Sequence, residues 1–227
     1  MSKAINQIFD DYNKSRIQFT QNISDLCLKS HNIEILINTD IIILLRPLLL
    51  DKVPIVQQNA TFILGKLANY IKSASVWTIG NIGKHSTDHA KKIADENILI
   101  ILVNLYNAND SSDDLKKKIK ISLKAIIQKI TDFEALQPVF LKSTFKLAKY
   151  SIFQFSKILP NNPSYKKMFI KSGCLKYLQE IKHSEEGKKL DLEIKSINKI
   201  FPEDIINYYT PGYSDTLIKR IDEVEKN

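Results

Sequence analysis

One short group of residues has the spacing of a metal site. His85 and His89 stand four residues apart and flank Asp88, an arrangement that places both imidazoles on one side of a helix, as in many zinc sites. No other His or Cys lies nearby in the sequence to complete the ligand set, and Ser86 or Thr87 is typical of a helix N-cap. We therefore expect the start of a surface helix here and no bound metal.

Patterns of catalysis and cofactor binding are missing from the 227 residues. The sequence has no GxGxxG, Walker, HExxH or GxSxG motif, and no group of residues resembles a catalytic constellation. Cys27 and Cys174 are far apart, each in an apolar stretch, which favours two buried reduced thiols over a disulfide. The sequence predicts a protein that is not an enzyme and holds no cofactor.

A run of lysines is the strongest charged feature. The segment 107–120, NANDSSDDLKKKIK, passes from an acidic loop to a basic helix face, within a chain of net charge +8 and pI about 9.2. One interpretation is a solvated helix whose charges complement its dipole. The other is a face for an acidic partner, formed by Lys116, Lys117, Lys118, Lys120 and Lys124. Interleaved aromatics and known nucleic-acid modules are missing, so we expect no nucleic-acid partner.

The elements that carry these residues are predicted to be helices. Apolar residues recur three or four apart along most of the chain, no segment alternates with period two, and the six glycines and seven prolines are few. The most hydrophobic run, residues 41–50, is too short to span a membrane and contains Arg46 and Pro47, which predicts a buried helix with a break. The polar residues after Met1 predict no secretory signal, and we expect no membrane partner.

Three segments share one layout, a helix, a tight junction and an apolar helix. They span 33–45, 90–102 and 165–178, with Asp40, Asn97 and Gly173 at the junctions. These three residue types tolerate the left-handed conformation that turns one helix into the next. We expect that conformation at all three junctions.

A phrase near the middle of the chain occurs twice. LGKLANY at 64–70 is followed, 15 residues after its start, by IGNIGKH at 79–85. The distance from Asp40 to Asn97 exceeds one armadillo period of roughly 40 to 47 residues by about this separation. We expect 53–85 to form one long helix, with a break near Ile71 as the alternative.

The stretch 74–82, ASVWTIGNI, resembles the third-helix motif A-x-x-W-x-L-x-N-I of armadillo proteins. In that family the Trp and Asn share one helix face, line a concave groove and contact an extended peptide, which implies groove contacts for Trp77 and Asn81. The matching places hold Phe62 and Lys66 in the first copy and Ala125 and Lys129 in the later unit. Simple packing of the Trp remains the alternative.

Longer segments carry a closer resemblance. They are FDDYNKSRIQF, NIEIL, LLRPLLLDKVPIVQQNATFILGKLANY, QFSKILP, SGCLKYLQEIK and FPEDIINYYTPGYSDTLIKRID. Together they resemble the two ends of axonemal central-apparatus armadillo-repeat proteins, the sperm-associated antigen six family. Because members of that family carry a longer repeat array, the chain resembles an internally shortened form that lacks most central repeats, joined near Ile71 and Lys72.

The resemblance implies an all-α, right-handed armadillo solenoid of about three repeat units with a C-terminal helical cap. The expected parts are an N-terminal helix plus first unit over 1–72, a partial third helix plus second unit over 73–135, and a C-terminal unit and tail over 136–227. A repeat that has lost its neighbour leaves apolar surface uncovered, so self-association is also expected.

The same resemblance implies a non-enzymatic scaffold in the central apparatus of cilia and flagella, supporting motility through protein–protein and microtubule-associated contacts. The implied partners are central-pair proteins and tubulin, and the implied location is the cytoplasm, cytoskeleton and axoneme. The alternative is a general armadillo peptide-binding adaptor similar to nuclear-import carriers. Those carriers read basic cargo with acidic grooves and several Trp–Asn pairs, whereas this chain is basic and has one such pair.

Overall fold

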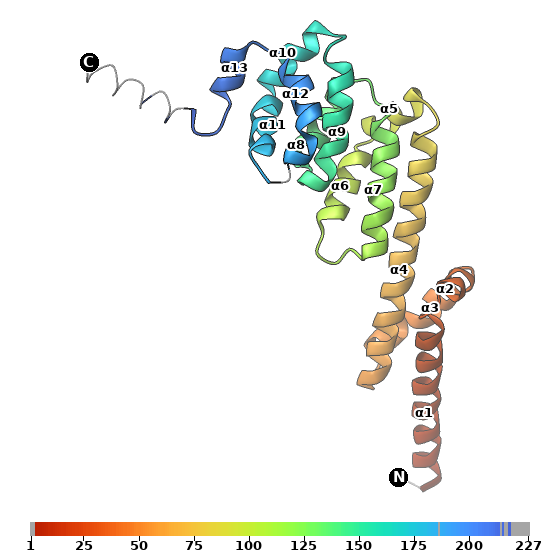
Figure 1. Ribbon diagram of the computed structural model, residues 1–227. Helices are drawn as coiled ribbons and strands as arrows, with labels where there is room; N and C mark the ends of the chain where they lie inside the picture. The colour runs from red at the N-terminus through yellow and green to blue at the C-terminus, as the bar shows by residue number, and fades with distance from the viewer. Residues whose placement is uncertain (1–2, 186, 214, 216–217, 219–227) are drawn as a thin grey trace. The chain divides into compact units, whose positions relative to one another are not determined.

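The computed structural model describes residues 3–185, 187–213, 215 and 218 (Figure 1). Throughout these residues the regular secondary structure is helical and no strand occurs, which confirms the all-α prediction. The chain divides into two compact units, unit 1 over Met1–Ser75 and unit 2 over Val76–Asn227.

Unit 1 begins with three helices of decreasing length. They are α1 (Lys3–Leu26), α2 (Ser30–Ile37) and α3 (Ile41–Leu45), followed by the 3₁₀ helix η1 (Pro47–Leu50) and the first part of α4 (Pro54–Gly83). Their apolar faces form a small core of Cys27, Ile33, Leu36, Ile41, Leu45, Ala60, Ile63 and Leu67.

Polar contacts hold α1 in unit 1. The Arg16 guanidinium pairs with the buried carboxylate of Asp51, which also accepts a hydrogen bond of 2.8 Å from the Val53 backbone N–H. The Asn59 amide donates to the Thr20 hydroxyl at 3.3 Å. Since Thr20 is the buried residue of α1, the helix is attached at its middle by polar groups more than by apolar packing.

The apolar run at 41–50 is broken as predicted, but only part of it is buried. Pro47 lacks a backbone N–H and begins η1, which interrupts the helix after Leu45. Ile41 and Leu45 are buried in the core, but Ile43 is 69% exposed and Leu50 is 87% exposed, so the expectation of a buried segment holds for one side of the run only. The physical reason is that unit 1 offers no second helix layer to cover the other side of the run.

Helix α4 runs from Pro54 to Gly83 without interruption. It therefore agrees with the expectation of one long helix over the doubled phrase, and Pro54 occupies the first turn, where its missing N–H costs nothing. The boundary between the two units falls inside this helix, after Ser75.

Unit 2 stacks its helices in two ranks (Figure 1). After α5 (Thr87–Asp95) come α6 (Ile98–Asn107), α7 (Asp113–Ile127), α8 (Phe133–Lys142), α9 (Phe145–Ile158), α10 (Pro163–Lys171), α11 (Cys174–Lys182), η2 (Gly187–Leu190), α12 (Asp191–Asn198) and α13 (Glu203–Tyr208). One rank is α6, α8 and α11, and the other is α7, α9 and α12, with each helix packed on the next in its rank. Layers that contact only their neighbours define an armadillo-type α-solenoid.

Two of the three junctions have the expected left-handed residue. Asn97 has φ 58° and Gly173 has φ 81°, whereas Asp40 has φ −75°. The expectation for Asp40 was wrong because three residues, 38–40, separate α2 from α3, while two separate α5 from α6 and α10 from α11. The extra residue lets the chain reverse through right-handed turns.

Aromatic rings fill the centre of unit 2. Phe155 lies between the ranks, with its ring centroid 5.6 Å from that of Phe133, 5.5 Å from that of Phe140 and 5.0 Å from that of Phe169. All four side chains are fully buried. The same buried core continues onto α7 through Ile119 and Leu123, and it holds α7 and α9, which carry the basic site described next, in fixed positions.

Candidate functional site

Helix α7 carries the predicted basic face, and its local sequence explains its start. The Ser112 hydroxyl accepts a hydrogen bond of 3.3 Å from the Leu115 backbone N–H, and Asp113 and Asp114 occupy the first turn. Apolar side chains three and four residues apart, among them Leu115 and Ile119, are buried. The lysines between them are therefore turned away from the core.

The five predicted lysines do not form one continuous face. Lys116, Lys117 and Lys120 line a hollow of about 610 Å³. The Nζ atom of Lys118 instead pairs with the Asp114 carboxylate of the preceding turn at 3.0 Å, and Lys124 is exposed outside the lining of the hollow. The structure thus divides the run into three lysines of the hollow and two others.

The other wall of the hollow comes from the next layer of the solenoid. Thr144, Phe145 and Lys146, at the start of α9, face Tyr106 and Asn107 at the end of α6. Sequence reasoning missed Lys146, which lies 22 residues beyond Lys124. The signal that could have found it is the stacking itself, because α7 and α9 are neighbours in one rank and the starts of both line the same hollow.

Aromatic side chains stand beside the lysines. The Lys120 Nζ lies 5.4 Å from the centroid of the Tyr106 ring, a cation–π distance. Burial raises the pKa of the nearby Tyr150 phenol, Lys120 opposes this shift, and Tyr106 adds to it. The hollow therefore joins a positive rim to a partly apolar wall.

The start of α9 adds positive potential to the same hollow. Thr144 is the N-cap residue, but its side chain makes no capping hydrogen bond, so the first N–H groups of the helix have no side-chain acceptor there. The N-terminal end of a helix carries partial positive charge and attracts anions. This effect acts in the same direction as the four lysines.

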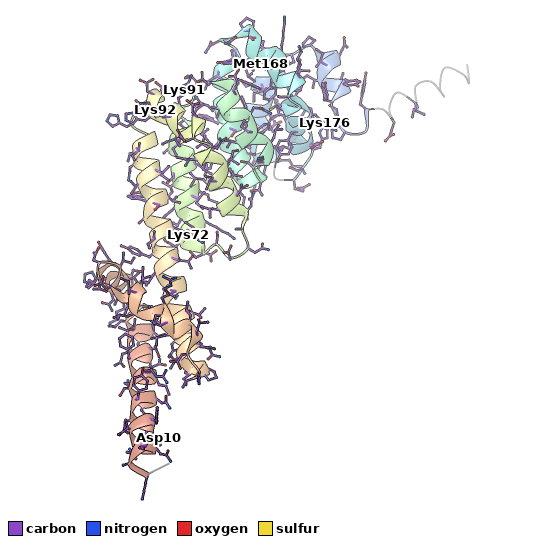
Figure 2. All side chains as sticks on the ribbon, turned by 180° about the vertical axis from the view of Figure 1, so that it is seen from behind. Asp10, Lys72, Lys91, Lys92, Met168 and Lys176 are labelled. Carbon is purple, nitrogen blue, oxygen red and sulfur yellow. The ribbon has the colours of Figure 1, made fainter. Side chains whose placement is uncertain are left out.

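Other hollows of unit 2 are lined by fewer lysines, one to three where the hollow beside α7 has four. Lys91, on α5 (Figure 2), places its Nζ 2.9 Å from the Asp132 carboxylate, which raises the pKa of Lys91 through a hydrogen bond. Lys176, on α11 (Figure 2), shares a hollow with Glu180 and the segment 208–213. The hollow beside α7, with four lysines and one aspartate, is the strongly basic one of these three.

Trp77 and Asn81 lie one turn apart on α4, within unit 2. Trp77 is 49% exposed and Asn81 is half-buried. The helix face beside them is fixed by the Ser122 hydroxyl, which donates a 2.9 Å hydrogen bond to the Val76 carbonyl. An exposed Trp is available to a ligand, and its role in peptide contact stays a prediction.

The histidine pair belongs to the start of α5. Ser86 is the N-cap and accepts a hydrogen bond of 3.2 Å from the His89 backbone N–H, as the sequence indicated. The rings of His85 and His89 are 5.2 Å apart. Within the part of the chain described, no group of three or more His, Cys, Asp or Glu side chains is arranged to hold a metal ion.

Both cysteines are buried free thiols, as predicted. Burial raises the pKa of Cys174 to about 11, opposed by a hydrogen bond from Ser172. Burial also raises the pKa of Cys27, and the charge of Lys66 opposes that shift. Neither thiol is therefore prepared for nucleophilic chemistry.

Among the described helices, none has both the length and the apolar character to cross a membrane.

The two stacked ranks of unit 2 define an armadillo-type repeat protein, and sequence comparison is more specific. No family model matches the chain. Human sperm-associated antigen 6 is 43% identical over 157 residues, 69% of this chain and 31% of the human protein. The mouse protein of the same name is 42% identical over the same shares. Over these 157 residues the chain is a homologue of sperm-associated antigen 6.

The chain spans about a third of the length of these curated relatives. Among solved structures, the designed armadillo repeat protein YIII(Dq)4CqI is 16% identical, with 80% of this chain and 93% of that chain covered and a TM-score of 0.36. That score is too low to establish a shared fold. The fold assignment rests instead on the two ranks of unit 2.

Proposed function

We propose that the chain is a non-enzymatic scaffold of the ciliary and flagellar axoneme, in the central apparatus, and that it supports motility through contacts with other proteins. The observation that carries this proposal is the 43% identity to human sperm-associated antigen 6. The solenoid suits the role, because stacked repeats present extended surfaces to partners.

Localisation tests this proposal. A fluorescent tag on the endogenous gene in a flagellated cell is expected to give signal along the axoneme, retained after detergent extraction. A tagged, unrelated protein of similar size serves as the control. Signal that is diffuse, nuclear or lost on extraction contradicts the proposal.

Microtubules are the second proposed contact, and the net charge of +8 supports it. Purified chain is expected to pellet with taxol-stabilised microtubules at low salt, and to be released as salt screens the attraction. No pelleting at low salt would contradict direct microtubule binding and leave the central-pair proteins as the proposed partners.

The organisation proposed for the chain has three parts, 1–72, 73–135 and 136–227, with most central repeats missing at a join near Ile71 and Lys72. The doubled phrase on α4 and the length of the relatives support this shortened organisation. Transcript reads across the codons of Tyr70 to Ser75 test it. Reads that always contain additional repeats at this place would contradict the short form.

One observation favours a second candidate, a general peptide-binding adaptor: Trp77 is half exposed and stands one turn from Asn81. An adaptor of this kind would bind an extended peptide, and Trp77→Ala would weaken the binding about tenfold or more. Peptide-array screening of the wild-type chain and this variant separates the two functions. A panel with no Trp77-dependent ligand would exclude the adaptor.

A further inference from the structure

We infer that the hollow formed by the end of α6 and the starts of α7 and α9 is a binding site for an acidic peptide segment that carries an aromatic side chain among its carboxylates. The inference rests on the proposed scaffold function, since it names the kind of partner that the scaffold contacts. We call this site the α7–α9 hollow, lined by Lys116, Lys117, Lys120, Lys146, Tyr106 and Phe145.

The positive charge of the hollow is uncompensated within the described part of the chain. Lys116, Lys117, Lys120 and Lys146 bring four ammonium groups to one hollow, and Asp113 is the carboxylate at its edge. No ion pair within the described residues engages any of the four. Like charges gathered in a concave site raise the local potential and attract a chain of opposite charge.

The lysines of the hollow come from two layers of the solenoid. Three stand on α7 and the fourth on α9, and the fully buried Phe155 and Leu123 keep these two helices in place. A ligand therefore meets a rigid arrangement, so little ordering of the backbone opposes binding. Because the positions lie far apart in sequence, a solvated helix face does not account for the grouping.

Two aromatic residues form part of the wall of the hollow. Phe145 is partly buried and leaves ring surface at the hollow, while Tyr106 is buried and lines it with the Lys120 Nζ over its ring. An apolar wall adds contact area that carboxylates alone do not use. The geometry thus fits a short acidic segment with one aromatic residue better than a purely acidic one.

Size and side-chain type favour a peptide over nucleic acid or a phosphate group. A hollow of about 610 Å³ holds a few side chains. Its cations are all lysines, whereas recognition of phosphate often uses the planar fork of arginine. The hollow therefore suits the carboxylates of a peptide better than a phosphate group.

The experiment measures fluorescence anisotropy of a labelled ten-residue peptide that contains six Glu and one Phe. The first control peptide has every Glu replaced by Gln, and the second has Phe replaced by Ala. We expect saturable binding of the acidic peptide, loss of binding with Gln, and about threefold to tenfold weaker binding with Ala.

Matched variants of the full chain locate the site. Lys117→Glu and Lys146→Glu change one lysine on each side of the hollow, and each is expected to weaken binding about tenfold. Both side chains are exposed, and Lys146 also lies in the first turn of α9, where an acidic residue suits the dipole, so the variants should fold. Lys124→Glu is the control, because it makes the same change of charge on α7 outside the lining and should alter affinity less than about twofold.

Several results would overturn the inference. Equal weakening by Lys124→Glu and Lys146→Glu would show a response to net charge alone. Binding of the Gln peptide as tightly as the Glu peptide would rule out recognition of carboxylates. A phosphopeptide or an oligonucleotide that binds more than about tenfold tighter, with the same dependence on Lys146, would assign the hollow to phosphate. None of these outcomes bears on the axonemal signal of the tagged protein, so the two proposals fail separately.

Discussion

The two copies of the phrase on α4 have similar sequences and opposite surroundings. In the second copy a Cβ placed on Gly80 would lie 2.3 Å from the Ser122 Oγ, and one on Gly83 would lie 2.6 Å from the Ile126 Cγ1. In the first copy nothing lies within 4 Å of a Cβ placed on Gly65. The same helix therefore has two glycines, Gly80 and Gly83, pressed against a neighbouring helix and one, Gly65, in open space.

The difference between the two copies shows the structural role of Gly80, which is close packing of two helices. Gly80 allows α7 to approach α4 so closely that Ser122 donates a hydrogen bond to the Val76 carbonyl. Gly65 stands at the matching place of the first copy and has no such helix beside it. This pattern agrees with the proposal of missing central repeats, under which a residue suited to close packing would remain where a packed layer had been removed.

The largest effect should come from the apolar core behind the first copy. Leu67 is 1% exposed in the small core of unit 1, and Leu67→Ala is expected to lower the free energy of unfolding of that unit by about 2–5 kcal/mol. Each unit has one buried cysteine, Cys27 in unit 1 and Cys174 in unit 2. Labelling of the native chain with a thiol reagent should become faster at Cys27 and stay slow at Cys174.

Leu123→Ala is the matched control for this comparison. Leu123 is fully buried in the core of unit 2, so its truncation should accelerate labelling at Cys174. If both variants expose both thiols together, the two units unfold as one and the contrast between their cores has no thermodynamic meaning.

A smaller effect is expected at the second copy. Gly80→Ala forces a methyl group against Ser122, whose Cβ and Cα atoms would be only 2.7 Å and 3.0 Å from it, so we expect a loss of about 1–3 kcal/mol. Denaturant unfolding followed by circular dichroism measures this loss. Stability equal to that of the wild-type chain would show that α7 does not pack on this glycine in solution.

The hydrogen bond across the same contact is worth less. Ser122→Ala removes the bond to the Val76 carbonyl, and the expected loss is about 1 kcal/mol. Because Ser122 and Gly80 touch, their effects should not add, and the double variant tests this coupling. Strict additivity would contradict the close approach of the two helices.

The sequence predicted helices, periods and junction types, because these depend on local spacing. Asn97 and Gly173 are examples, since a left-handed residue is needed wherever two residues link two helices. The sequence did not predict the right-handed conformation of Asp40, which depends on loop length. Nor did it predict the exposure of Leu50, which depends on whether another helix layer covers that side chain. It also missed Lys146 in the basic site, because only stacking of distant segments brings that side chain to α7.

The smallest effect has the opposite sign and concerns Gly65. Since an added methyl group meets nothing within 4 Å and the residue lies inside a helix, Gly65→Ala should stabilise the chain by about 0.5–1 kcal/mol. Thermal unfolding at two protein concentrations measures the shift. A destabilisation that grows with concentration would mean that another chain covers this face in solution, because only an associated neighbour would then meet the methyl group. The sign of the stability change for Gly65→Ala, compared with that for Gly80→Ala, thus shows whether the helix face at Gly65 is exposed to solvent or covered by another chain.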